Sequence, residues 1–111
     1  MLNLSAATRV FVATAPVDLR RSFNGLFACV QQQLRLDPLS GHLFVFCNRA
    51  RNRLKILVWD GSGLWVCAKR LERGRFSWPR ADSVVATLRN EELTALTSGL
   101  EVRAKRGWYR R

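Results

Sequence analysis

The sequence has few acidic residues and few residues that bind metals. Eight Asp and Glu oppose nineteen Lys and Arg, and His42 is the one histidine. Three cysteines, Cys29, Cys47 and Cys67, lie about twenty residues apart and form no Cys-x-x-Cys pair. A zinc site cannot be assembled from this set on normal ligand spacing. We therefore expect reduced cysteines that act as small apolar residues, with no bound metal and no cofactor.

Long apolar runs are also missing. The run from Leu54 to Val58 is already interrupted by Lys55, and no run approaches the length of a membrane span. The N-terminal stretch MLNLSAATRV lacks the basic-then-apolar pattern of a signal peptide. The sequence therefore predicts no membrane partner and a cytoplasmic location.

Carboxylates that would converge on a catalytic metal are not apparent. A nuclease or transposase site needs two or three of them close together, and helix starts or turns account for most candidates. Asp60 and Glu72 come nearest to a nuclease pair, but Glu72 is followed by Arg73-Gly74 instead of x-Lys. We expect that the protein is not an enzyme and that His42, at a strand start, is structural.

Arginine is what the sequence has in excess. The net charge is +11, and sixteen of the nineteen basic residues are Arg. The planar guanidinium fork matches phosphate and stacks on bases. This balance indicates a polyanionic partner, most simply nucleic acid. A GC-rich genome that favours Arg codons is the alternative for the arginines, but it does not explain the shortage of acids.

A helix is predicted over residues 18–36, with Asp18 as its N-cap and a stop before Pro38. Its apolar residues recur at helical spacing, and they are Leu19, Phe23, Leu26, Phe27, Val30 and Leu34. The opposite face carries a polar stripe of Arg20, Asn24, Gln31 and Arg35. That stripe is either a solvated face or a secondary phosphate contact through Arg20 and Arg35.

Runs of β-forming residues bounded by turn residues predict strands over 10–13, 42–47, 54–59, 64–69 and 76–78. The segment 83–88 reads as either a strand or a helical start. A short helix over 91–98 follows, with Asn90 as its cap and Gly99 as its stop. The tail 101–111 carries five basic residues and two aromatics, and its composition is compatible with disorder in the free protein.

These elements predict one α+β domain over residues 1–100. We expect an antiparallel sheet of four to five strands with one face packed on the N-terminal helix, and a short C-terminal helix. The predicted core consists of Phe23, Leu26, Phe27, Val30, Leu34, Phe44, Phe46, Ile56 and Val58.

The register of the central hairpin decides what it presents. A three-residue loop over 61–63 pairs Trp59 with Trp65 and Lys55 with Lys69, on one face, and leaves Ile56 and Val58 on a core face. Such a face would suit phosphates and stacked bases. A two-residue loop would scatter this set. The alternative for the two tryptophans is that they are core aromatics covered by the helix.

Two stretches carry a family resemblance. PVDLRRSFNGL at 16–26 and DPLSGHLFVFCNRARNRLKILVWDGSGLWVCAKRLERGRFSWP at 37–79 resemble the TnpB accessory family, the second open reading frame products of the sixty-six family of bacterial insertion sequences. The resemblance implies a small accessory protein that acts alongside a separate, larger transposase carrying the acidic catalytic residues. Asn24, Cys47 and the Cys67-Ala68 pair depart from the expected pattern.

We therefore expect a non-catalytic accessory protein of insertion-sequence transposition that binds DNA, at element ends or as non-specific duplex. The expected contacts are Arg49, Arg51, Arg53, Lys55, Lys69, Arg70, Arg73 and Arg75, with Trp59 and Trp65. Phosphate contacts of this kind give affinity more than sequence choice. The alternative is an adaptor that binds the transposase without touching DNA, because interface hot spots also favour Trp and Arg.

Overall fold

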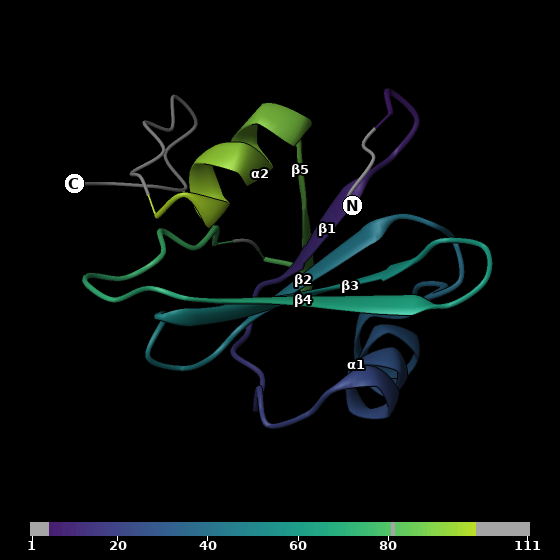
Figure 1. Ribbon diagram of the computed structural model, residues 1–111, viewed down its shortest axis with the longest axis horizontal. Coiled ribbons are helices and arrows are strands. Elements are labelled where there is room, and N and C mark those ends of the chain that lie inside the picture. The colour runs from purple at the N-terminus through teal and green to yellow at the C-terminus, as the bar shows by residue number, and fades with distance from the viewer. Residues whose placement is uncertain (1–4, 81, 100–111) are drawn as a thin grey trace.

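The computed structural model describes residues 5–80 and 82–99, so the predicted basic tail lies outside the described residues (Figure 1). Five strands form one sheet in the order β4-β3-β2-β1-β5. The strands are β1 (Val10–Ala13), β2 (Leu43–Cys47), β3 (Arg53–Trp59), β4 (Leu64–Arg70) and β5 (Val85–Leu88). Together with two helices, this confirms the α+β fold. The sequence predicts either a strand or a helical start over 83–88, and this segment contains the strand β5.

The sheet is mixed, so the prediction of a purely antiparallel sheet is wrong. Strand β1 runs parallel to β2, with Val10 opposite Leu43, whereas the other neighbouring strands are antiparallel. Parallel neighbours need a crossover connection, and the N-terminal helix supplies it between β1 and β2. Strand β5 then returns to the far side of β1, with Leu88 opposite Val10.

Helix α1 (Phe23–Cys29) begins five residues later than predicted, and it continues as a π-helical turn, η1 (Val30–Leu34). Asp18 is not its N-cap. The Asp18 carboxylate instead accepts the backbone N–H of Arg20 at 3.0 Å and closes a turn ahead of the helix. The π-helical turn ends where Arg35 takes a left-handed conformation, with φ of 58°.

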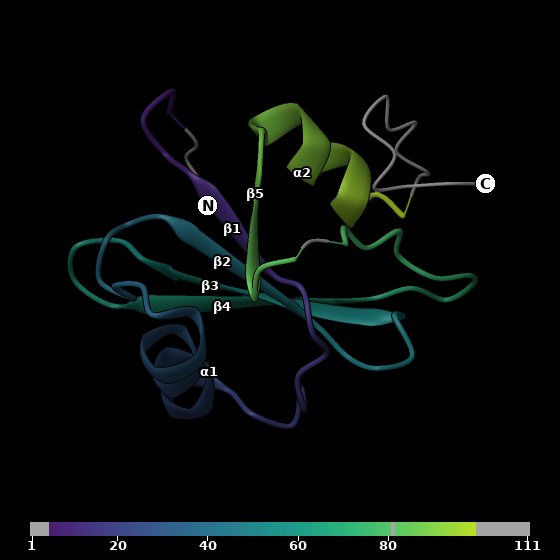
Figure 2. The ribbon, with the colours of Figure 1, turned by 180° about the vertical axis from the view of Figure 1, so that it is seen from behind.

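A helix covers each face of the sheet, and Figures 1 and 2 show α1 and α2 on its opposite sides. On one face, α1 packs its buried side chains against Phe44, Phe46 and Leu57. On the other, α2 (Asn90–Thr97) buries Leu93 and Leu96 against strand residues that include Val45 and Ile56. The whole of β2 is therefore buried, as expected for a central strand.

The predicted core is largely confirmed. Buried members are Leu26, Val30, Leu34, Phe44, Phe46, Ile56 and Val58. Phe27 is partly buried against the α1 cluster, but Phe23 is 47% exposed at the start of α1, so its assignment to the core is wrong. The late start of the helix explains this, because Phe23 sits in its first turn, at the rim of the packed face.

Residues 76–78 are not a strand, which corrects that prediction. The segment is irregular, and its Phe76 and Trp78 are buried in the same core cluster as Leu93 and Leu96 of α2. The indole Nε1–H of Trp78 donates to the carbonyl of Ala13 at 2.9 Å. Helix α2 begins at Asn90 with Arg89 as N-cap, so the prediction of Asn90 as the cap is wrong by one residue. Gly99, with φ of 73°, follows its end as predicted.

Candidate nucleic-acid interface

The β3–β4 hairpin closes on the four-residue turn Asp60–Gly63, in which the N–H of Asp60 donates to the carbonyl of Gly63 at 3.0 Å. This is the register of the two-residue-loop alternative, so the prediction of a three-residue loop is wrong. Asp60 causes the difference. Its carboxylate accepts the backbone N–H groups of Ser62 and Gly63, both at 2.9 Å, and the indole N–H of Trp65 at 2.7 Å. These bonds hold the pKa of Asp60 at about 2, with the Ser62 backbone bond the largest cause.

The predicted register is therefore wrong by one residue. Trp59 lies opposite Leu64, and Trp65 lies opposite Val58, so the two tryptophans are on opposite faces of the sheet. Lys55 lies opposite Ala68, not Lys69. A one-residue slip moves every β4 side chain to the other face. Trp59 is half-buried, whereas Trp65 is 45% exposed, and the two rings do not form the expected pair on one face.

The corrected register brings a different pair of cations together, Arg53 and Arg70, directly across β3 and β4. The backbone N–H of Leu71 donates to the carbonyl of Asn52 at 2.8 Å, and hydrogen-bonded pairs alternate along an antiparallel ladder. Arg53 and Arg70 are therefore a non-hydrogen-bonded pair, the kind in which Cα atoms approach to about 4.5 Å. Both side chains are exposed.

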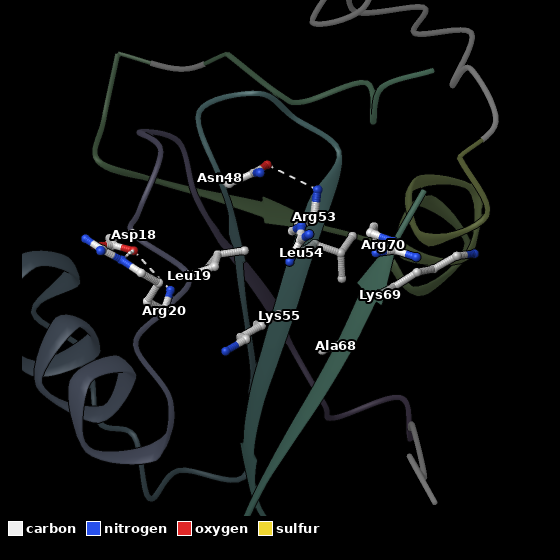
Figure 3. Close-up of a pocket in the computed structure, with 10 residues that line it drawn as sticks. All are labelled: Asp18, Leu19, Arg20, Asn48, Arg53, Leu54, Lys55, Ala68, Lys69 and Arg70. Carbon is white, nitrogen blue, oxygen red and sulfur yellow. Dashed lines mark hydrogen bonds and ion pairs between the residues drawn. The ribbon is translucent and has the colours of Figure 1, made fainter. Parts of the chain in front are cut away.

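A groove of about 520 Å³ opens beside this pair, between the 18–20 turn and the ends of β3 and β4 (Figure 3). We call it the basic groove, because five of its ten lining residues are Lys or Arg and one is acidic. The lining residues are Asp18, Leu19, Arg20, Asn48, Arg53, Leu54, Lys55, Ala68, Lys69 and Arg70.

The cations of the basic groove differ in their partners. Arg20 forms an ion pair with Asp18 at 2.6 Å, and Arg70 forms one with Glu72 at 3.0 Å. The ammonium of Lys55 donates to the carbonyl of Arg21 at 2.9 Å, which ties the hairpin to the segment before α1. Within residues 5–80 and 82–99, no side-chain partner is found for Arg53. Exposed ion pairs contribute about 0–1 kcal/mol, so an anion in the groove can replace them.

Lys69 lines the basic groove, but its ammonium points toward α2 (Figure 3). It donates to the carbonyl of Thr97 at 2.6 Å, at the C-terminal end of that helix. A cation is favourable at this end of a helix dipole. The structure thus gives Lys69 an internal partner on the face opposite Lys55.

Asp18, the acid among the described residues that line the basic groove, is held ionised. The pKa of Asp18 lies at about 2, mainly because the side chain of Arg20 donates to it, and the Arg20 backbone N–H adds to the effect. Asp18 therefore orients Arg20 without being neutralised near pH 7. The groove keeps an excess of positive charge under those conditions.

The loop 48–52 at the end of the groove is ordered by Asn48. Its side-chain oxygen accepts the backbone N–H groups of Asn52 and Arg53, both at 3.1 Å, and its amide donates to Asn52 at 2.8 Å. Asn48 is not among the residues predicted from the sequence. The signal was the asparagine that directly follows the buried strand β2, since such residues hydrogen-bond to the backbone in turns.

Arg49 and Arg51 in this loop have different environments. Arg49 is exposed, whereas Arg51 is half-buried with its guanidinium 5.5 Å from the ring centre of Trp78. One guanidinium nitrogen of Arg51 is buried without a hydrogen-bond partner within the described residues. Its backbone carbonyl accepts the N–H of Phe76 at 2.7 Å. Arg51 therefore contributes to the packing of the loop on the 71–78 segment.

The remaining predicted cations are Arg73 and Arg75, in the segment after β4, and Arg20 and Arg35 of the secondary stripe. Arg73 and Arg75 are exposed in the 71–76 segment, which is bonded to the 48–52 loop through Leu71 and Phe76. Of the secondary stripe, Arg20 lines the basic groove, while Arg35 ends η1 and is not among the lining residues. The two do not share a helix face, because α1 starts only at Phe23.

The two carboxylates that came nearest to a nuclease pair are far apart. Asp60 precedes β4 and Glu72 follows it, so the seven-residue strand separates them, by roughly 20 Å at the usual rise per residue. Across residues 5–80 and 82–99, no group of three His, Cys, Asp or Glu is placed to hold a metal ion. No helix in that part of the chain is long and apolar enough to cross a membrane.

The chain is similar to known proteins over nearly its whole length. The model of the family described as IS66 Orf2 like protein matches residues 8–107. The uncharacterized protein y4jC of Sinorhizobium fredii (strain NBRC 101917 / NGR234) is 41% identical over 107 residues, 96% of this chain and 92% of that protein. The uncharacterized protein y4hO of the same organism is 41% identical over 103 residues, 93% and 90% of the two chains. No solved structure matches the chain.

Proposed function

The chain belongs to the IS66 Orf2 like protein family, and from that premise we propose that it is a non-catalytic accessory protein of an insertion sequence that binds duplex DNA through the basic groove. The observation that carries the proposal is the Arg53–Arg70 pair. Like charges directly opposite in a sheet are destabilising by about 0.2–1 kcal/mol. A phosphate between the two guanidinium groups relieves that repulsion and gains charge-assisted hydrogen bonds.

The shape of the groove supports a backbone contact more than a base contact. It is open and bordered by Arg20 on one side and by Arg53 and Arg70 on the other (Figure 3). Such a surface can follow a phosphate chain without reading its sequence. Arg49, exposed at the tip of the 48–52 loop, is the residue we propose for any contact with base edges.

Arg73 and Arg75 extend the proposed contact beyond the groove, since their segment is bonded to the 48–52 loop. Arg51 has a smaller part in the proposal, because its guanidinium lies against Trp78. Lys69 likewise has a partner on α2. Lys55 is also bonded internally, to the carbonyl of Arg21. The proposed contact therefore rests on three groove residues and three loop residues, namely Arg20, Arg53, Arg70, Arg49, Arg73 and Arg75.

The test is fluorescence anisotropy of labelled duplexes that carry the element's terminal sequences, with scrambled duplexes of equal length as controls. Binding that weakens steeply as salt rises supports the proposal, because bound phosphates release counterions. Preference for the terminal sequences would add specificity. No binding at low salt, despite a net charge of +11, would refute it.

An adaptor that binds the element's transposase is the second candidate. The observation in its favour is Trp65, 45% exposed and fixed by its bond to Asp60, because fixed tryptophans are frequent anchors of protein interfaces. Salt separates the two functions. An interface anchored on an aromatic ring loses little affinity at ionic strengths that abolish phosphate contacts.

A further inference from the structure

Strand β4 forms an edge of the sheet and has little protection against pairing with another strand. Proteins usually protect such edges with Lys, Pro or a bulge. The first five residues of β4, Leu64–Ala68, carry no charge and no proline. Its register with β3 is one-to-one along its whole length, so it contains no bulge. Charged residues occur only at its end, as Lys69 and Arg70.

The backbone groups that face outward can be assigned from the ladder. The bonds from Leu71 to Asn52 and from Asp60 to Gly63 fix which residues bond to β3, and their direction alternates along the strand. The other β4 residues direct their N–H and C=O groups away from β3. They are Leu64, Val66, Ala68 and Arg70. Within residues 5–80 and 82–99, no strand pairs with these groups.

We propose that this edge pairs with β4 of a second copy of the chain, antiparallel and centred on Cys67. That register uses all seven residues of each strand. It sets Leu64 opposite Arg70 and Val66 opposite Ala68, so every outward-facing residue meets another outward-facing residue. The hydrogen-bonding pattern of the two edges is therefore self-complementary.

The side chains are complementary in the same register. Lys69 of one copy lies opposite Trp65 of the other, and Arg70 lies opposite Leu64, so no two like charges are directly paired. Trp65 is held in place by its bond to Asp60, and in the proposed pair its exposed ring faces the aliphatic chain of the opposite Lys69, whose ammonium keeps its bond to Thr97 of its own chain. These matches favour a second copy over an unrelated strand.

The two-fold axis of such a pair is perpendicular to the sheet, so both copies present the same face on the same side. The two five-stranded sheets become one continuous sheet, and both basic grooves lie on its α1 face. The inference rests on the edge of β4 and holds whether or not the groove binds DNA.

Sedimentation velocity of the full chain across protein concentration and salt provides the test. We expect a dimer of about 25 kDa, twice 12.7 kDa, whose dissociation constant falls as salt rises, because screening reduces the repulsion between two chains of charge +11. This salt dependence is opposite to that expected for DNA binding, so the two proposals can fail separately. A monomer at every concentration and salt would overturn the dimer.

Ala68→Pro and Ala68→Val form a matched pair for this experiment. The N–H of Ala68 faces outward, so proline removes an intermolecular bond without removing a bond to β3, and proline is tolerated on edge strands. Valine keeps the N–H and favours the strand. We expect a folded monomer for the proline variant and a dimer for the valine variant. Equal dimerisation of both variants would contradict the assigned edge.

Cross-linking through Cys67 tests the register, whether or not the proline variant folds. Two Cys67 residues facing each other form a non-hydrogen-bonded pair with Cα atoms about 4.5 Å apart, within the range that a disulfide spans. Diamide takes one hydrogen from each thiol, and the sulfurs bond. We expect a covalent dimer that Cys67→Ser abolishes, while Cys29 and Cys47 are buried. A dimer that gives no Cys67 cross-link would overturn the register.

Discussion

Arg53 of β3 lies directly opposite Arg70 of β4, with both side chains on the face that carries the basic groove. Glu72 pairs with Arg70 at 3.0 Å and offsets part of the repulsion, but both members of that ion pair are well exposed. The hairpin therefore keeps two like charges together at its open end. In an isolated sheet this arrangement is unfavourable, and an anion bound at the groove, as we propose, would offset the repulsion.

Replacing Arg53 should separate binding from stability. We expect Arg53→Gln to weaken duplex binding several-fold and to leave the melting temperature equal to that of the wild type or slightly higher, because a like-charge pair is removed. Anisotropy and thermal denaturation of the same preparation measure the two effects. A variant that binds normally, or one that binds poorly because it is unfolded, would count against the proposed role.

Arg51 should behave differently from Arg49, its neighbour but one. Arg51→Ala removes the guanidinium from the face of Trp78 and should lower the free energy of unfolding by about 1 kcal/mol. Arg49→Ala removes an exposed side chain, and its effect on stability should stay within about 0.5 kcal/mol. Urea denaturation measures the free energy of unfolding of both variants. An equal decrease in the two would contradict the assigned packing of Arg51.

Trp78→Phe should be strongly destabilising. The change leaves the carbonyl of Ala13 without the indole N–H that it accepts at 2.9 Å in a buried position, at a cost of about 1–3 kcal/mol. Trp59→Phe is the control, since Trp59 is only half-buried. Chemical denaturation should give the Trp78 variant a clearly lower free energy of unfolding than the Trp59 variant. The reverse order would show that the Ala13 contact is unimportant.

The Asp60 turn should make hairpin stability depend on acid pH. The folded pKa of Asp60 is about 2, below the ordinary value of 3.8 for an aspartate, because the backbone of Ser62 and the indole of Trp65 donate to the carboxylate. The stabilisation is therefore complete above about pH 4 and is lost as pH falls toward the folded pKa of about 2. The gap in melting temperature between the wild type and Asp60→Asn should shrink over that window. A gap independent of pH would contradict the network.

The strands were predictable because their signals are local. Strand β1 has the predicted bounds, and β2, β3 and β4 agree within a residue at either end, since β-forming runs and turn residues mark them. The register was not predictable from the same signals. The register depends on whether Asp60 is the last residue of the strand or the first residue of the turn. Four hydrogen bonds to its carboxylate stabilise the turn that begins at Asp60.

The start of α1 shows the same limit. Asp18 and Ser22 are both suitable N-caps by residue type. Tertiary bonds determine the outcome, because the N–H of Val17 bonds to the carbonyl of Cys47 at 2.9 Å and Lys55 bonds to the carbonyl of Arg21. These contacts hold residues 17–21 outside the helix. The burial of Arg51 is likewise set by Trp78, which lies 27 residues along the chain and carries no local signal.

The salt dependence of duplex binding for the wild type, Arg53→Gln and Arg9→Gln tests whether the basic groove binds DNA. Arg9 is an exposed cation beside the start of β2, at the end of the sheet away from the groove, so its variant makes the same charge change elsewhere. If the Arg53–Arg70 groove contacts phosphate, the slope of log K against log salt becomes shallower by about 0.9 in Arg53→Gln and stays at the wild-type value in Arg9→Gln. Equal slopes for the two variants would show that net charge, and not the Arg53–Arg70 groove, holds the DNA.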